Sequence, residues 1–176
     1  MMPKVVLNVA SSADYFIADD NGGVDWLPGE DSDPGDSCGM TLFKSEVYVI
    51  VMGNRSYQQI LSFGNWAWPD KLTYVFTSQR YLVANNHVKF LHDSPEHCIE
   101  TIRKSANNKK IWLLGGAQLA HAFFDKNLVD EVILTIIPTF LGNGIKLNVP
   151  FSKFDLVSEK SCAGGTFQRN YIRKTI

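Results

Sequence analysis

The stretch from residue 110 to residue 128 restricts the possible folds more than any other part of the chain. It begins with an uninterrupted apolar run at residues 111–114, which is typical of a strand buried on both faces of a parallel sheet. Gly115 and Gly116 end the run, and from Ala117 the apolar residues follow a helical period. The sequence therefore predicts a strand, a diglycine turn and a helix. The free N–H groups of such a helix start favour a phosphate, but a plain turn is the alternative, because the G-x-G-x-x-G fingerprint is absent.

The same alternation of strands and helices extends along the rest of the chain. Apolar, β-rich runs predict strands at residues 4–10, 47–52, 72–76, 88–91 and 129–137. Helices are predicted from Ser37 or Cys38 to Glu46, over residues 54–63, and from Pro95 behind an N-cap at Ser94. Polar and apolar residues alternate over 154–161 and 166–174, which predicts a hairpin. The pattern indicates an α/β three-layer sandwich with a mainly parallel central sheet and a C-terminal antiparallel hairpin.

The composition narrows the possible partners and surroundings of the chain. Its 176 residues suit one domain, and its net charge of −1 argues against nucleic acid or an anionic membrane as a partner. No apolar stretch is long enough to span a membrane, and the N-terminal apolar run is too short for a signal peptide. Cys38, Cys98 and Cys162 are odd in number and far apart, so neither a metal site nor a disulfide framework is expected. These features favour a cytoplasmic location.

Four segments occur in an order that carries a family resemblance. They are residues 12–18 with 23–27 (SADYFIA, GVDWL), residues 51–57 (VMGNRSY), residues 112–119 (WLLGGAQL), and residues 128–131 with 138–144 (LVDE, PTFLGNG). Together they resemble the C-terminal reductase domain of the bifunctional riboflavin-biosynthesis deaminase-reductase, over residues 3–174. The chain has no cytidine-deaminase zinc signature, so it resembles the stand-alone form. The resemblance implies a dihydrofolate reductase-like fold and a single reductase domain over residues 1–176.

The resemblance also implies a reaction. The expected activity is that of an NADPH-dependent oxidoreductase similar to 5-amino-6-(5-phosphoribosylamino)uracil reductase, which transfers hydride from the nicotinamide to a C=N-type substrate. The implied substrate is a pyrimidine or pterin-like small molecule, NADH is the alternative cofactor, and a homodimer is expected. The sequence agrees with this reading, because hydride transfer needs no protein nucleophile and no G-x-S-x-G or H-E-x-x-H motif is present.

The residues implied to bind the cofactor come from several turns. Two phosphate-binding turns, a site for the adenosine 2′-phosphate and a frame for the nicotinamide ring comprise Ala10, Ile17, Gly53, Asn54, Arg55, Ser56, Thr77, Ser78, Arg80, Gly115, Gly116, Ala117, Gln118 and Leu119. Within this set, Arg80 would meet the 2′-phosphate, since a guanidinium binds a phosphate bidentately. The family usually has arginine where Asn54 stands, which weakens the expected preference for NADPH.

The substrate side depends on fewer residues. Asp14 is the predicted catalytic residue and substrate anchor, and Asp25, Trp26, Leu141 and Gly142 are predicted to line the substrate pocket. A turn or capping role is the alternative for Asp14.

A second departure from the family pattern and two rival functions remain open from the sequence. Tyr15 stands where the family usually has glycine, which would reshape the substrate mouth. Trp26, Pro28 and Glu30 mimic the order that binds the pteridine in dihydrofolate reductase, so dihydrofolate reduction is one alternative function. A nucleotide-binding module without catalysis is the other.

Overall fold

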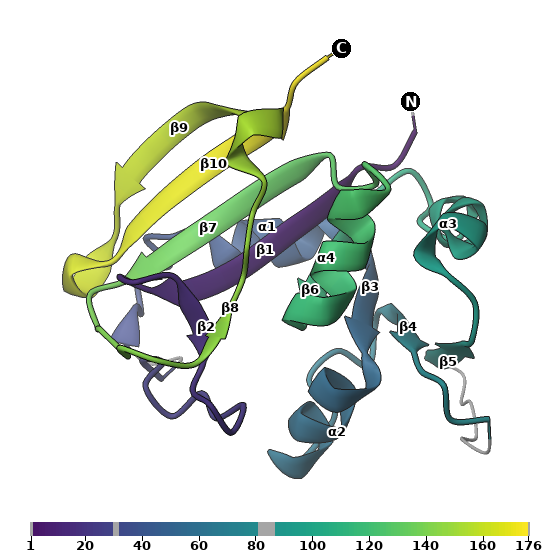
Figure 1. Cartoon of the computed structure of the whole chain (residues 1–176), viewed down its shortest axis with the longest axis horizontal. Coiled ribbons are helices and arrows are strands. Elements are labelled where there is room, and N and C mark those ends of the chain that lie inside the picture. Colours follow the sequence, from purple (N-terminus) through teal and green to yellow (C-terminus); the bar gives the residue numbers. More distant parts are fainter. Residues whose placement is uncertain (1, 30–31, 81–86, 176) are drawn as a thin grey trace.

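The computed structural model describes residues 2–29, 32–80 and 87–175. An eight-stranded sheet runs through the molecule in the order β5-β4-β3-β6-β1-β7-β10-β9 (Figure 1). In chain order its strands are β1 (Val5–Ser12), β3 (Val47–Gly53), β4 (Leu72–Phe76), β5 (Val88–Leu91), β6 (Lys110–Gly115), β7 (Glu131–Ile137), β9 (Phe154–Ser161) and β10 (Phe167–Arg173). A separate ribbon pairs β2 (Phe16–Ala18) with β8 (Ile145–Lys146).

The pairing directions confirm the predicted sheet. β1 pairs in parallel with β6 and β7, and β3 pairs in parallel with β4 and β6. β10 then pairs antiparallel with both β7 and β9, so the C-terminal hairpin closes one edge. The carboxyl ends of parallel strands lie along a common edge of the sheet. The turns after β3 and β6 come together at this edge.

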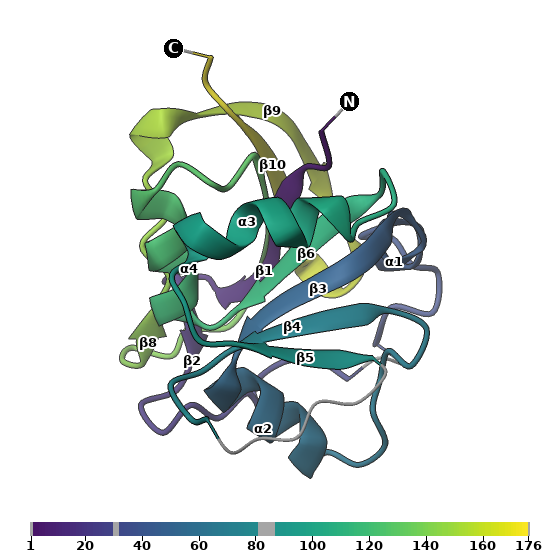
Figure 2. The ribbon, with the colours of Figure 1, turned by 90° about the vertical axis from the view of Figure 1, so that its right-hand side faces the viewer.

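Helices cover both faces of this sheet. They are α1 (Met40–Glu46), α2 (Asn54–Ser62), α3 (Pro95–Lys104) and α4 (Ala117–Asp125). The core on one face contains residues of α3 and α4, and the core on the other contains residues of α1 and α2. Figures 1 and 2 show this arrangement from two directions. The predicted three layers are therefore confirmed.

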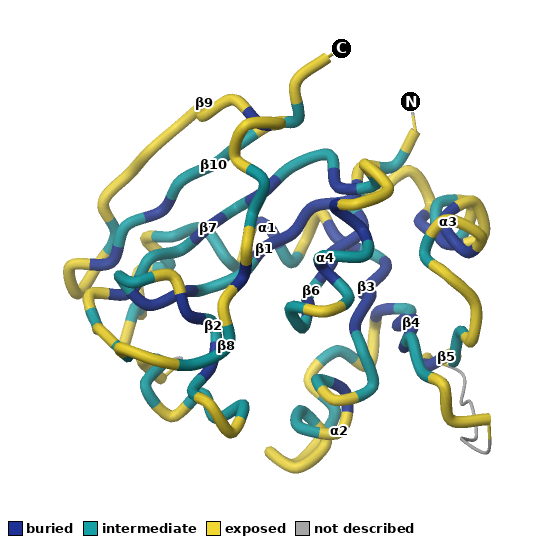
Figure 3. Tube along the Cα trace, in the orientation of Figure 1, coloured by how far each residue is buried: buried dark blue, intermediate teal, exposed yellow. Residues whose placement is uncertain are grey.

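The central strands are buried because their sequences are apolar on both faces. Val5, Leu7, Val49 and Leu113 are completely buried, as expected for a sheet covered on two sides. Each such side chain contributes roughly 1.5–3 kcal/mol of transfer free energy on burial. Figure 3 shows the contrast with β9, where every residue after Phe154 is exposed.

Several element boundaries differ from the predicted ones, and two of these differences have a clear local cause. α1 begins at Met40 rather than at Ser37 or Cys38, because the Asp36 carboxylate accepts hydrogen bonds from the N–H groups of Met40 and Thr41. This contact fixes the start of the helix later than the hydrophobic pattern suggested. β1 continues two residues beyond the predicted end, because Ser11 and Ser12 still pair with β7.

The cysteine prediction is wrong. Cys38 and Cys162 form a disulfide although 124 residues separate them, while Cys98 is a buried free thiol. The turn after β9 folds against the segment before α1, where Ala163 N–H donates to Ser37 Oγ at 2.7 Å. Spacing along the sequence could not show this proximity. No helix in the described residues has the length and apolarity needed to cross a membrane.

Candidate active site

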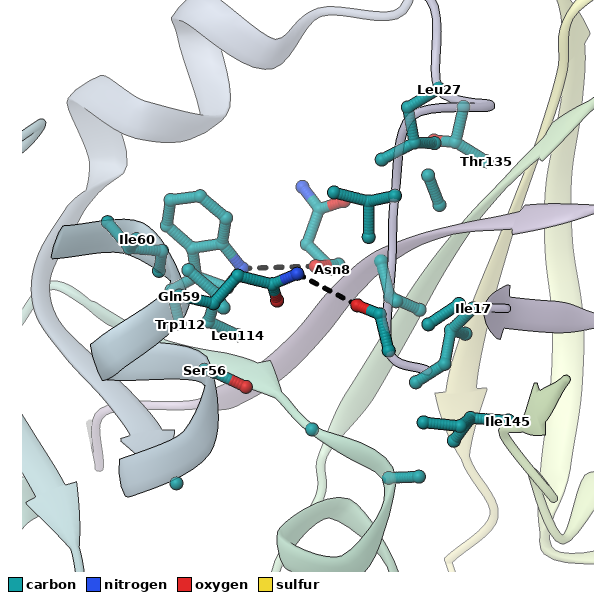
Figure 4. A pocket seen from close by; sticks show the side chains of 18 of the residues that line it. Asn8, Ile17, Leu27, Ser56, Gln59, Ile60, Trp112, Leu114, Thr135 and Ile145 are labelled. Atoms are coloured by element: carbon teal, nitrogen blue, oxygen red, sulfur yellow. Dashed lines mark hydrogen bonds between the residues drawn. The ribbon is translucent and has the colours of Figure 1, made fainter. Parts of the chain in front are cut away.

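A large cleft of about 2040 Å³ opens at the sheet edge where the parallel strands end (Figure 4). Its walls come from the N-terminal turns of α2 and α4, the β2–β8 ribbon and the loop that follows β2. The ends of β1, β6, β7 and β10 form its floor. Residues from distant parts of the chain therefore meet in one cavity.

Two helix starts face each other in this cleft. The N-caps of α2 and α4 are Gly53 and Gly116, and neither helix has a side-chain cap. The helix α3 differs, because Ser94 accepts a hydrogen bond from the His97 N–H. A Cβ placed on Gly116 would lie 3.5 Å from Ser56 Oγ, so the two turns are adjacent. Uncapped N–H groups with the positive ends of two helix dipoles form a site suited to a phosphate.

The diglycine turn requires glycine at its first position. Gly115 has a φ of 119°, a conformation that side-chain-bearing residues rarely adopt. The Gly115–Gly116 peptide bond is cis. The predicted strand, glycine pair and helix are thus present, with α4 starting at Ala117 as expected.

The loop after β2 is held across the cleft by α2. The Asp19 carboxylate accepts hydrogen bonds from the N–H groups of Asn21 and Gly23, which fixes the turn. Gln59 Nε2 then donates to the Gly22 carbonyl at 2.8 Å, as Figure 4 shows. Arg55 donates to the Asn21 carbonyl at 3.4 Å. Arg55, which the sequence analysis expects to bind the cofactor, lines the cleft, and its guanidinium is directed at this loop.

The floor contains polar residues that the sequence analysis missed. Asn8, Thr135 and Gln168 line the cleft from β1, β7 and β10. Gln168 Nε2 donates to Thr135 Oγ1 at 3.1 Å, and Trp112 Nε1 donates to the Asn8 carbonyl at 3.1 Å. A signal for Asn8 was available, because it is a lone polar residue in an otherwise apolar central strand.

Most residues predicted for the cofactor lie together in the cleft. Those among its lining residues are Ala10, Ile17, Gly53, Asn54, Arg55, Ser56, Thr77, Ser78, Gly116, Ala117, Gln118 and Leu119. Gly115 and Arg80 do not line it, although each directly adjoins a lining residue in the sequence, Gly116 and Gln79 respectively. On the substrate side Trp26 lines the cleft, whereas Asp14, Asp25, Leu141 and Gly142 do not.

Asp14 has a different environment from the one predicted. Its carboxylate accepts hydrogen bonds from Ser12 Oγ at 2.6 Å, from Leu141 N–H at 3.1 Å and from Gly142 N–H at 2.7 Å. The Ser12 hydroxyl and the two backbone donors lower the pKa of Asp14 to about 2. The side chain is therefore ionised at neutral pH and holds the loop after β7 against the start of β2. A turn role, the alternative in the sequence analysis, accounts for these contacts.

Two carboxylates of the segment before α1, both of which line the cleft, also accept hydrogen bonds from neighbouring residues. Asp36 caps α1, and Asp33 accepts from Ser37 Oγ at 2.9 Å and from the Cys38 N–H at 3.3 Å. Glu30, the residue of the dihydrofolate reductase alternative, lies outside the described residues.

Comparisons with known sequences give a consistent family. The family model of the RibD C-terminal domain matches residues 3–163. The chain is 33% identical over 148 residues to uncharacterized protein YwjB of Bacillus subtilis (strain 168), covering 84% of this chain and 83% of that protein. It is 28% identical over 186 aligned positions to uncharacterized protein YyaP of the same organism, covering 96% and 94%.

Solved structures share the architecture. A structure named for riboflavin biosynthesis, from Shewanella sp. PV-4, has a TM-score of 0.80 at 24% identity and covers 99% of this chain and 100% of its own. The Thermotoga maritima diaminohydroxyphosphoribosylaminopyrimidine deaminase/5-amino-6-(5-phosphoribosylamino)uracil reductase has a TM-score of 0.72 at 17% identity, covering 98% and 57%. Enterococcus faecalis dihydrofolate reductase, complexed with NADP(H) and RAB-propyl, has a TM-score of 0.71 at 18% identity, covering 98% and 97%. The predicted dihydrofolate reductase-like fold is confirmed.

Proposed function

Because this chain belongs to the RibD C-terminal domain family, we propose that it is a pyridine-nucleotide-dependent reductase. The substrate proposed from the sequence is a small pyrimidine of the 5-amino-6-(5-phosphoribosylamino)uracil type. Support comes from the bifunctional Thermotoga protein, whose name includes that reductase activity, and from the dihydrofolate reductase solved with NADP(H). Residues 1–176 form one reductase domain in this proposal.

The observation that carries the proposal is the pair of uncapped helix starts in one cleft. The N-terminal turns of α2 and α4 offer backbone N–H groups to the same space, and glycine at both N-caps leaves room for a ligand to approach. A diphosphate that links two sugars carries the negative charge that these N–H groups favour, and it can occupy the space between the two helix starts. When bound, a reduced nicotinamide supplies the hydride, and the protein contributes binding, orientation and exclusion of water.

NADPH is the proposed cofactor rather than NADH. Thr77 and Ser78 line the cleft after β4, and Arg80 follows them as an exposed cation. These residues offer hydroxyl donors and a guanidinium to an additional phosphate on the adenosine ribose. An Arg80→Gln variant is expected to weaken NADPH binding more than NADH binding, because only NADPH carries that phosphate.

A charge placed between the two helix starts tests the cofactor site. Ser56 is the third residue of α2, and an acidic residue there suits the helix dipole, so Ser56→Asp is expected to fold as well as the wild type. The new carboxylate repels a diphosphate, and we expect the Kd for NADPH to rise at least about tenfold. Titration calorimetry with NADPH measures the change.

Gln58→Glu is the matched control. It adds the same charge to the same helix, on an exposed residue that does not line the cleft, so NADPH affinity should stay within about twofold of wild type. Equal affinity of Ser56→Asp and wild type would contradict the proposed cofactor site.

NADPH consumption with 5-amino-6-(5-phosphoribosylamino)uracil and with dihydrofolate separates the rival functions. Turnover of the first substrate supports the proposal, and turnover of dihydrofolate alone favours the dihydrofolate reductase alternative. Tight NADPH binding without turnover of either favours a module without catalysis.

Two further expectations stay predictions. Light scattering coupled to size-exclusion chromatography tests the homodimer. The cytoplasmic location loses its argument from unpaired cysteines, since Cys38 and Cys162 are joined.

A further inference from the structure

Two nearly buried carboxamides lie on the floor of the cleft. Asn8 and Gln168 each have 7% of their surface exposed, and both line the cavity. Across the sheet, Ala10 pairs with Thr135, and Thr135 pairs with Gln168. Paired residues on neighbouring strands share a face, as do residues two apart on one strand. Asn8, Thr135 and Gln168 therefore project from the same face as Ala10, which the proposed function places beside the cofactor.

The protein uses little of the hydrogen-bonding capacity of these two side chains. Gln168 Nε2 donates to Thr135 Oγ1, and Asn8 Nδ2 approaches only the Met40 sulfur, a weak acceptor, at 3.9 Å. Among residues 2–29, 32–80 and 87–175, no donor is bonded to the side-chain oxygen of Asn8 or of Gln168. Neither oxygen is among the buried side-chain atoms that lack a partner, so both are open to the cleft, where a ligand can supply the donor in place of water. Figure 4 shows the Asn8 side chain standing in the pocket.

The sheet floor around the carboxamides is uncharged. Strands β1, β6, β7 and β10 of the large sheet contribute only uncharged described residues to the floor. These are Asn8, Val9, Ala10, Trp112, Leu114, Thr135, Ile137 and Gln168. The charged residues that line the cleft, Lys44, Arg55 and Lys146 among them, belong to its walls, so an ion bound flat on the sheet floor would lose hydration with no opposite charge beneath it. A neutral ring bearing polar groups at its edge avoids that cost.

We propose that Asn8 and Gln168 are specificity-determining residues that read the edge of a cyclic amide. A carboxamide offers a donor and an acceptor side by side, which complements the adjacent C=O and N–H of such a ring. The Cα atoms of Asn8 and Gln168 are separated by two strand spacings across the sheet and by two residues along a strand, which amounts to about 12 Å. One ring bound above this face can therefore reach both side chains. Thr135 is a positioning residue that orients Gln168. The inference rests on the proposed function only for the place of the cofactor.

Binding of 6-aminouracil, a small neutral cyclic amide, tests this assignment. The compound is titrated into the full chain with saturating NADP⁺ and without it, beside benzoate and benzamidine as charged rings of similar size. The variants are Asn8→Leu and Gln168→Met, which keep the volume and remove the carboxamide. Asn170→Leu is the matched control, since Asn170 is a carboxamide on the same strand that does not line the cleft.

We expect 6-aminouracil to bind the wild type in preference to both charged rings. Its Kd should rise about tenfold in Asn8→Leu and in Gln168→Met, while the Kd for NADP⁺ and the melting temperature stay close to wild type. Asn170→Leu should bind 6-aminouracil as the wild type does. Thr135→Val should also raise the Kd for 6-aminouracil. In the Gln168→Met background it should raise the Kd no further, because a positioning residue acts only through its partner.

The outcomes separate this inference from the proposed function. The assignment is overturned if NADP⁺ binds the wild type while 6-aminouracil at millimolar concentration does not. It is also overturned if 6-aminouracil binds Asn8→Leu and Gln168→Met as tightly as it binds the wild type. Equal or tighter binding of benzoate or benzamidine also overturns it. If NADP⁺ fails to bind while 6-aminouracil binding still depends on both carboxamides, the proposed function fails and the assignment stands.

Discussion

The Asp14 carboxylate joins two segments that lie 127 residues apart in the sequence. Its oxygens accept from Ser12, Leu141 and Gly142, and their donated hydrogens stabilise the ionised form. A group with a pKa of about 2 is a poor proton donor at neutral pH. A catalytic acid role would require a raised pKa, so the contacts favour Asp14 as the residue that sets the position of the loop after β7.

Replacement of Asp14 by asparagine tests this role through its pH dependence. The folded-state pKa is depressed from 3.8 to about 2, so the ionised carboxylate stabilises the fold above about pH 4, and this contribution is lost as the pH falls toward 2. Asp14→Asn should lower the melting temperature at pH 7, and the difference from wild type should shrink between pH 4 and pH 2. Thermal melts across this range measure it.

Asp125→Asn provides the comparison, because Asp125 is an exposed carboxylate outside this loop. It should melt like the wild type at every pH. A pH-independent difference between Asp14→Asn and wild type would show that the carboxylate charge is not the stabilising feature.

At this scale the sequence indicated many of the residues that line the cleft near the helix starts, and few of those on its floor. Gly53, Ser56 and Gly116 were identifiable because glycine and small polar residues follow apolar strands. Gln168 was not, because its place on the floor depends on the antiparallel pairing of β10 with β7. That pairing is a tertiary contact with no local signature.

Among the elements, the β2–β8 ribbon depends on one glycine. Gly144 precedes β8 with a φ of 141°, and a Cβ there would overlap the Ala18 carbonyl oxygen of β2. Ile17, Ala18, Ile145 and Lys146 of the two strands all line the cleft. A side chain at Gly144 would therefore separate the strands that form one wall.

Gly144→Ala is expected to lower the free energy of unfolding by roughly 2–3 kcal/mol. Gly142→Ala is the control, because Gly142 also has a positive φ of 76° but has open space around its Cβ position. Gly142→Ala should lower the free energy of unfolding by about 1 kcal/mol, because only the positive φ disfavours alanine there. Chemical denaturation measures both values, and equal losses would mean that the overlap with Ala18 is relieved by a shift of the loop.

Some element positions agree with the sequence-based expectation. β4, β5 and β9 have the predicted bounds, and α3 begins behind Ser94 as its N-cap. The start of α1 was placed too early because Asp36 caps it through a turn that the hydrophobic pattern does not reveal. Local side-chain contacts of this kind override periodicity at helix ends.

For the whole molecule, the Cys38–Cys162 disulfide links the segment before α1 to the turn between β9 and β10. Both cysteines line the cleft, so the bond connects two parts of its wall. The fold class followed from strand and helix alternation, since that pattern admits few topologies, whereas the strand order came only from the structure. The disulfide did not follow from it, because the turn between β9 and β10 meets the segment before α1 only in three dimensions.

Loss of this bond should destabilise the fold. The Cys38→Ser/Cys162→Ser double variant is expected to lose roughly 2–5 kcal/mol, because a bond across 124 residues strongly restricts the unfolded chain. Denaturation with and without dithiothreitol measures the effect. Reductant should lower the stability of the wild type to that of the double variant and leave the variant unchanged, and a reductant-sensitive variant would contradict the assignment.

The same bond makes the polypeptide between residues 38 and 162 a closed covalent ring. A protease that cleaves once inside this ring leaves both fragments attached, and they migrate separately on a gel only after reduction. Nicked protein should therefore keep its native mass in the absence of thiols, so cleavage within the ring can go unnoticed on a non-reducing gel.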